Sequence, residues 1–152
     1  MKTYTGELTV STPIGDERSP FTVTMEEKAI DADVRAELIV FGKDFEGNGC
    51  DLEWGDAFAE LQKSLPEGYA LKCCLTCRHG NTWIYGNVPN LVFCTHGETI
   101  RDKDDLIDFF CGTKSESAAR KATDVCEKFA PQSEDCFTYN NYGYYLKGKN
   151  DG

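Results

Sequence analysis

The chain has 152 residues with eight cysteines, and its formal net charge is −10. This length suits one compact domain that folds without disulfide bonds, and the cysteine density is below that of a short disulfide scaffold. The acidic surface excludes nucleic acid and anionic membranes as partners, because both are bound through Lys and Arg side chains. We therefore expect a protein partner, while the sequence leaves the oligomeric state open.

The excess of acidic side chains lies in the N-terminal part of the chain. Residues 1–70 hold fifteen acidic and six basic side chains, whereas residues 71–100 hold Lys72, Arg78 and one acid, Glu98. A solubilising surface explains this better than a site for a basic partner. The start of the chain lacks the apolar run of a secretion signal, and no segment has the roughly eighteen apolar residues that span a bilayer. We predict a cytoplasmic protein, whose clustered cysteines are metal ligands or redox thiols in a reducing compartment.

Residues 4–42 alternate between apolar and polar side chains. The apolar positions form three sets: Tyr4, Leu8 and Val10; Phe21, Val23 and Met25; Ala36, Leu38 and Val40. A period of two predicts strands, so we expect an antiparallel sheet with one face in water. Residues 11–20, "STPIGDERSP", are rich in breakers and predict a connection.

A helix is predicted next, from the spacing of Trp54, Phe58 and Leu61, and it ends before Pro66. The glycines of residues 42–51, "GKDFEGNGCD", indicate a turn, and the segment lacks the lysine and serine that end a phosphate-binding loop.

Residues 69–98 carry four of the eight cysteines and both histidines. If residues 69–74 form a strand, Cys73 joins the apolar face as a small hydrophobic residue and Cys74 pairs with Cys77 across a tight turn. The stretch "WIYGNVPNLVFC", residues 83–94, predicts a strand, a turn at 86–90 and a second strand that ends at Cys94.

Two further helices are predicted in residues 99–148. Thr99 or Asp102 caps the first, which Gly112 ends. The second occupies about 113–130, after a capping box and before a proline. The aromatic tail packs back on the domain, and residues 149–152 are expected to be disordered.

The sequence therefore predicts an α+β fold within a single domain of residues 1–148. It contains an N-terminal antiparallel β-sheet with a helix in 1–68, a Cys-rich β/turn segment in 69–98, and a helical part with the tail in 99–148. Two or three short helices are expected in all.

The cysteine spacing predicts a zinc site. Cys74 and Cys77 form a C-x2-C motif, which turns two sulfurs toward one ion, and Cys94 follows after sixteen intervening residues. Four candidates remain for the fourth ligand of a tetrahedral site: His96, Cys111, Cys126 and Cys136. Lys72 and Arg78 flank the motif and could offset the excess thiolate charge, although a solvated surface role explains them equally well.

Cys126 is the predicted fourth ligand, because on the expected last helix it lies beside the apolar stripe that faces the cysteine loop. The segments "CCLTCRHGNTWIYGN", "LVFC" and "DVCEKF" also resemble an uncharacterised bacterial family of small proteins, over about residues 70–130. That family carries a C-x2-C, a Gly-Asn turn, a later cysteine and a C-x2-F. The resemblance implies Cys74, Cys77, Cys94 and Cys126 as the matching set and implies no activity.

The two C-x-H-G repeats depart from this family pattern and leave the roles of His79 and His96 open. A Cys-His dyad is one possibility, and a histidine that braces a turn is the preferred one.

The predicted function is a non-catalytic zinc-binding small domain, a binding or regulatory protein with a structural site of four cysteines. Four protein ligands leave no position for water on the metal, so we expect no catalytic residues. The alternative is a thiol-dependent redox enzyme or sensor that uses Cys74 and Cys77. A turn follows Cys77 where a thioredoxin-like motif would start a helix, which disfavours that alternative.

Overall fold

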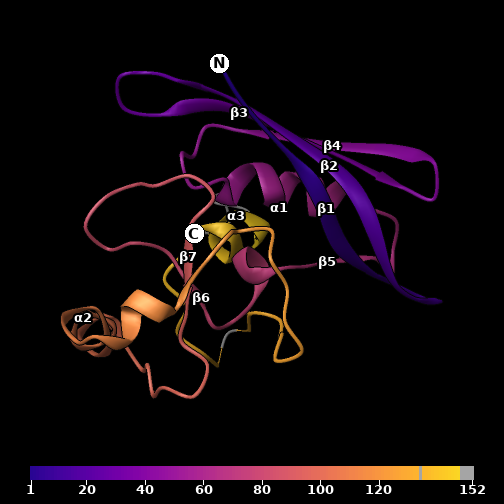
Figure 1. The fold of residues 1–152 in the computed structure, drawn as a ribbon. Coiled ribbons are helices and arrows are strands. Elements are labelled where there is room, and N and C mark those ends of the chain that lie inside the picture. The colour runs from indigo at the N-terminus through magenta and orange to yellow at the C-terminus, as the bar shows by residue number, and fades with distance from the viewer. Residues whose placement is uncertain (134, 148–152) are drawn as a thin grey trace.

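The computed structural model describes residues 1–133 and 135–147 and has an α+β fold, as predicted. A curled five-stranded antiparallel sheet, with strand order β4-β3-β2-β1-β5, forms the N-terminal part (Figure 1). Its strands are β1 (Lys2–Thr12), β2 (Gly15–Glu27), β3 (Ala32–Val40), β4 (Lys43–Gly49) and β5 (Ala70–Lys72).

One face of this sheet is buried and the other is open to water, as the alternation predicts. In β3 every second side chain is buried and those between are exposed; the buried ones are Ala32, Val34, Ala36, Leu38 and Val40. Helix α1 (Gly55–Ser64) lies beneath the buried face (Figure 1) and adds Phe58 and Leu61 to the core. The predicted first helix is therefore confirmed.

The glycine-rich segment predicted to be a turn forms strand β4 instead. Its glycines serve close packing: a Cβ atom at Gly47 would overlap the Ala57 carbonyl oxygen and the Leu61 amide nitrogen of α1. Because the helix backbone lies directly on this strand, only glycine fits at that position. The local composition signalled a turn, whereas the tertiary contact required a strand.

Residues 11–20 were expected to be a connection, and that prediction is wrong. The connection is a two-residue turn at Pro13 and Ile14, since Thr12 pairs with Gly15 and its hydroxyl donates to the Gly15 carbonyl over 2.7 Å. Strand β2 continues through the polar residues and reaches Pro20, which pairs with Glu7.

A second, three-stranded sheet has the order β6-β7-β8 and carries part of the cysteine segment. Its strands are β6 (Gly80–Asn81), β7 (Val92–Cys94) and β8 (Ala119–Arg120). Strand β7 ends at Cys94, as predicted. Its partner was expected to begin at residue 83, but the strand that pairs with it is β6, and residues 83–85 belong to the connection 82–91. The strand predicted at residue 83 is thus wrong.

Helix α2 (Lys103–Cys111) is the predicted helix before Gly112. Asp102 caps it, because its Oδ1 accepts the Asp105 amide over 3.0 Å. We expect Asp102→Ala to lower the free energy of unfolding by about 1 kcal/mol, since the amide loses its acceptor. Urea unfolding measures this cost, with the exposed Asp104→Ala in the same turn as the control. An equal cost for both variants would show that the cap contributes nothing.

The helix predicted over 113–130 is absent. The segment forms a 3-10 turn (Lys114–Ser117), strand β8 and a series of turns. Tertiary bonds take the backbone groups that a helix would use: the Ala122 amide donates to Asn90 Oδ1 over 3.0 Å, and the Ala122 carbonyl accepts from Leu75 over 3.0 Å. These partners lie far away in the sequence and override the local helical spacing.

The aromatic tail packs back on the fold, as predicted. It ends in α3 (Tyr142–Lys147), which contacts α1, and Lys63 Nζ donates to the Tyr145 carbonyl over 3.0 Å. The predicted disorder of 149–152 lies outside the described residues. No helix in the described part of the chain is long and apolar enough to cross a membrane.

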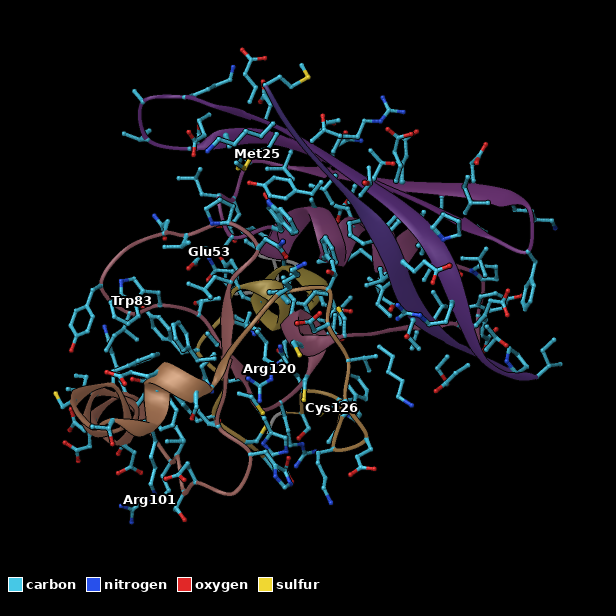
Figure 2. The ribbon with its side chains drawn as sticks, in the orientation of Figure 1. Met25, Glu53, Trp83, Arg101, Arg120 and Cys126 are labelled. Carbon is cyan, nitrogen blue, oxygen red and sulfur yellow. The ribbon has the colours of Figure 1, made fainter. Side chains whose placement is uncertain are left out.

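Glu53 is a buried acid between α1 and the 82–91 connection (Figure 2). Its Oε2 has no hydrogen-bond partner among the described residues. Burial and the Asp51 charge raise the pKa of Glu53 to about 7, against the opposing effect of hydrogen bonds with Thr82 and the Val88 backbone. The folded protein therefore keeps this carboxyl protonated where an exposed glutamate is ionised.

This burial predicts a pH dependence of stability. Between pH 4.5 and about pH 7 the folded state holds one more proton on Glu53 than the unfolded state does. The contribution of Glu53 to the free energy of unfolding therefore falls as pH rises through that window and then stays level. The loss amounts to about 3 kcal/mol at most. Urea unfolding across the window, compared with Glu53→Gln, measures the difference. Parallel pH curves for the two proteins would contradict the assignment.

Candidate metal centre

The C-x2-C motif lies in a single tight turn that follows β5. Cys74–Thr76 form a 3-10 turn, and the Cys77 amide donates to the Cys74 carbonyl over 3.3 Å. The His79 amide donates to Cys77 Sγ over 3.5 Å. Amide donors of this kind stabilise a sulfur ligand once it carries negative charge.

Strand pairing brings Cys94 to this turn. Gly80, three residues after Cys77, pairs directly with Cys94 across β6 and β7. Gly80 is also pressed against the cysteine turn, because a Cβ atom there would overlap the Cys74 carbonyl oxygen. The absence of a side chain at this position lets the turn and the strand lie against each other.

The loop that carries Cys126 is fastened to the same turn at both ends. The Cys74 amide donates to the Asp124 carbonyl over 2.6 Å, and the Arg78 amide donates to the Ala130 carbonyl over 2.7 Å. Figure 2 shows Cys126 on this loop. Two backbone bonds therefore place Cys126 beside the C-x2-C motif without the helix on which its prediction rested.

The four predicted ligands border one small cavity. Its volume is about 10 Å³, close to that of a single water-sized particle. It is lined by Cys73, Cys74, Cys77, His79, Gly80, Cys94, Val125, Cys126, Lys128 and Phe129. Cys126 is exposed, whereas Cys74 and Cys77 are buried, so the cavity is approached from the side of the Cys126 loop.

These side chains do not stand in a coordination geometry. Within residues 1–133 and 135–147, no group of three or more His, Cys, Asp or Glu side chains is arranged to hold a metal ion. None of the eight cysteines, all of which are described, forms a disulfide. The structure thus brings the four cysteines to one cavity as separate thiols.

The other three candidates for a fourth ligand do not line the cavity. Cys111 is exposed at the end of α2, and Cys136 contacts Ser133 and Thr138. The His96 ring is exposed and lies edge-on to the His79 ring, with centroids 5.0 Å apart. Of the two histidines, His79 borders the cavity and His96 lies against His79.

Burial keeps the inner thiols protonated. It raises the pKa of Cys73 to about 11, and it raises the pKa of Cys74 and of Cys77, with smaller contributions from the neighbouring cysteines. Cys73 also belongs to the hydrophobic core, as predicted, and contacts the Thr76 hydroxyl. Neutral buried thiols are poor nucleophiles, which disfavours Cys74 and Cys77 as a redox pair.

The cations near the site differ from the predicted pair. Lys72 forms an ion pair with Asp16 over 2.7 Å. Arg78 donates to the Pro131 carbonyl over 3.1 Å and to the Ser133 hydroxyl over 3.2 Å. It therefore braces the loop after Cys126, while the cation that borders the cavity is Lys128.

Two asparagines hold the site together and were not identified from the sequence. Asn81 is fully buried; its amide donates to Thr95 Oγ1 over 3.1 Å and its carbonyl oxygen accepts the Tyr139 amide over 2.6 Å. Asn140 donates to the Leu75 carbonyl over 3.1 Å. Their neighbours along the chain do not reveal these partners.

Comparison of the chain with protein-family models, with curated proteins and with solved structures finds no match. No family model therefore supports the resemblance of about residues 70–130 to a bacterial family of small proteins, and a proposed function depends on the geometry described above.

Proposed function

We propose that this protein is a non-catalytic zinc-binding domain whose structural site consists of Cys74, Cys77, Cys94 and Cys126. The observation that supports it is the double attachment of the Cys126 loop to the C-x2-C turn, which places these four cysteines, together with Cys73, around one ion-sized cavity. Four cysteine ligands from separate parts of a chain are typical of a structural zinc site.

Zinc binding requires the four thiols to rotate inward and release their protons. A cysteine side chain turns about one bond, so its sulfur moves without a change in the backbone. The attraction between Zn²⁺ and the thiolates exceeds the free energy needed to ionise the buried thiols. Lys128 and the His79 amide offset part of the remaining negative charge.

The site would act as a structural clamp. Four protein ligands exclude water from the ion, so the metal fixes the Cys126 loop to the rest of the fold and does no chemistry of its own. The protein then serves as a binding or regulatory domain for a protein partner.

Native mass spectrometry tests this proposal. Protein purified with zinc present is expected to carry one zinc ion per chain under native conditions and none after acid denaturation. A native mass equal to that of the bare polypeptide would contradict the proposal.

Thiol labelling separates the proposal from the redox alternative. The exposed Cys50 and Cys111 are first replaced by serine so that they do not react. We expect several of the remaining thiols to become reactive together when a chelator removes zinc. One fast-reacting thiol in a metal-free protein would favour the thiol enzyme or sensor.

A further inference from the structure

A second cavity lies apart from the cysteine cavity. It has a volume of about 710 Å³, within the range of small-molecule sites, and lies where β5, α3 and the loop after Phe129 meet. Leu71, Phe129 and Leu146 supply apolar walls. A cavity of this size accommodates the apolar body of a small organic molecule.

The charged side chains that line this cavity differ in sign from most of those in the chain. Among the described residues that line it, two are basic, Lys72 and Lys147, and none is acidic. Over the whole chain acids outnumber bases, at 26 to 16. The two lysines at the edge of the cavity attract an anion, whereas the acidic side chains elsewhere on the surface repel one.

Lys72 is held at the edge of this cavity by contacts on two sides. Its Nζ is 2.7 Å from Asp16 and 5.9 Å from the centre of the Phe129 ring. A partly exposed ion pair contributes little stability, so an anion in the cavity can share the ammonium group with Asp16.

Tyr142 adds a polar group to the apolar interior. The residue is 5% exposed and lines the cavity. Burial raises the pKa of Tyr142, so the hydroxyl keeps its proton and can donate it to an acceptor. A protonated hydroxyl on the wall of a largely apolar cavity favours a ligand that supplies an oxygen acceptor.

We infer that this cavity binds a small organic carboxylate with an apolar body. Lys72 and Lys147 would face the carboxylate, and Leu71, Phe129 and Leu146 would surround the apolar part. This inference goes beyond the proposed zinc function and does not depend on it. Carboxylate binding can therefore fail while the zinc content measured by mass still agrees with the metal proposal.

Three probes of the same shape test the inference: phenylbutyrate, its neutral amide and phenylbutylamine. We expect the carboxylate to bind about tenfold more tightly than the amide, and the amine to bind most weakly. Titration followed by backbone amide NMR shifts gives both affinity and location, with the shifts expected at 70–72 and at Gly143. Equal binding of the three probes, no saturation, or shifts confined to other parts of the chain would overturn the inference.

Matched variants test the role of the two lysines. The double variant Lys72→Gln, Lys147→Gln is expected to lose the tenfold preference, while Lys43→Gln, at the start of β4 and outside the cavity, keeps it. Carboxylate binding by the double variant as tight as by Lys43→Gln would contradict the assignment. If the double variant does not fold, Tyr142→Phe tests the cavity instead and should weaken carboxylate binding severalfold.

Discussion

Gly80→Ala is expected to destabilise the protein by about 4 kcal/mol and to abolish zinc binding at the cysteine turn. The added Cβ atom would overlap the Cys74 carbonyl oxygen, which belongs to the backbone and has no freedom to move aside. Either the C-x2-C turn or the β6–β7 pairing must then break, and both place ligands at the cavity. Urea unfolding and zinc content by mass spectrometry measure the two effects.

Gly86→Ala is the matched control for this substitution. A Cβ atom at Gly86 meets only Trp83 Cδ1, at 3.9 Å, which is an ordinary contact. We expect the free energy of unfolding of that variant to lie within about 1 kcal/mol of the wild-type value. Equal stabilities for the two variants would show that the close approach at Gly80 is not required by the fold.

Cys126→Ser is expected to weaken zinc binding by about 100-fold or more. Loss of a partner in the outer shell of a metal site already costs about 10- to 100-fold in affinity, and loss of a ligand costs at least as much. Competition with a chromogenic chelator measures the affinity. Cys111→Ser, at the exposed end of α2, is the control and should bind zinc like the wild type.

The same comparison decides between candidates for the fourth ligand. Unchanged affinity in Cys126→Ser, together with a large loss in His96→Ala or Cys136→Ser, would move the site away from the Cys126 loop. An equal loss in the Cys111→Ser control would mean that zinc binds to the chain without a defined site.

The elements with strong periodicity could be predicted from the sequence. The alternation in β3 places five buried side chains on one face, and the spacing of α1 places its apolar residues against the sheet. The Asp102 cap and Gly112 gave the ends of α2. In each case the residues that decide the structure are close neighbours along the chain, so local patterns contain the information.

The segments whose structure was predicted wrongly have a different physical cause in common. Strand β4 contains glycines because α1 lies on its backbone at Gly47, and residues 113–130 avoid a helix because their backbone groups bond to Asn90 and Leu75. Contacts between residues far apart in sequence decide both segments. Local composition then predicts the wrong structure, since glycine signals a turn and spaced alanines signal a helix.

The candidate site depends on local sequence patterns and also on contacts between residues far apart in the sequence. Cys74 and Cys77 share a turn that their spacing implies, and strand pairing adds Cys94. Cys126 borders the same cavity, although the predicted helix that was to carry it does not exist. The bracing by Asn81 depends on contacts with Thr95 and Tyr139 that no local pattern reveals.

X-ray absorption at the zinc edge tests the central claim most directly, because it reports the atoms bound to the ion. Protein loaded with one zinc ion is predicted to show a single shell of four sulfur atoms at about 2.3 Å. A shell containing nitrogen or oxygen, or fewer than four sulfurs, would contradict a site built from Cys74, Cys77, Cys94 and Cys126.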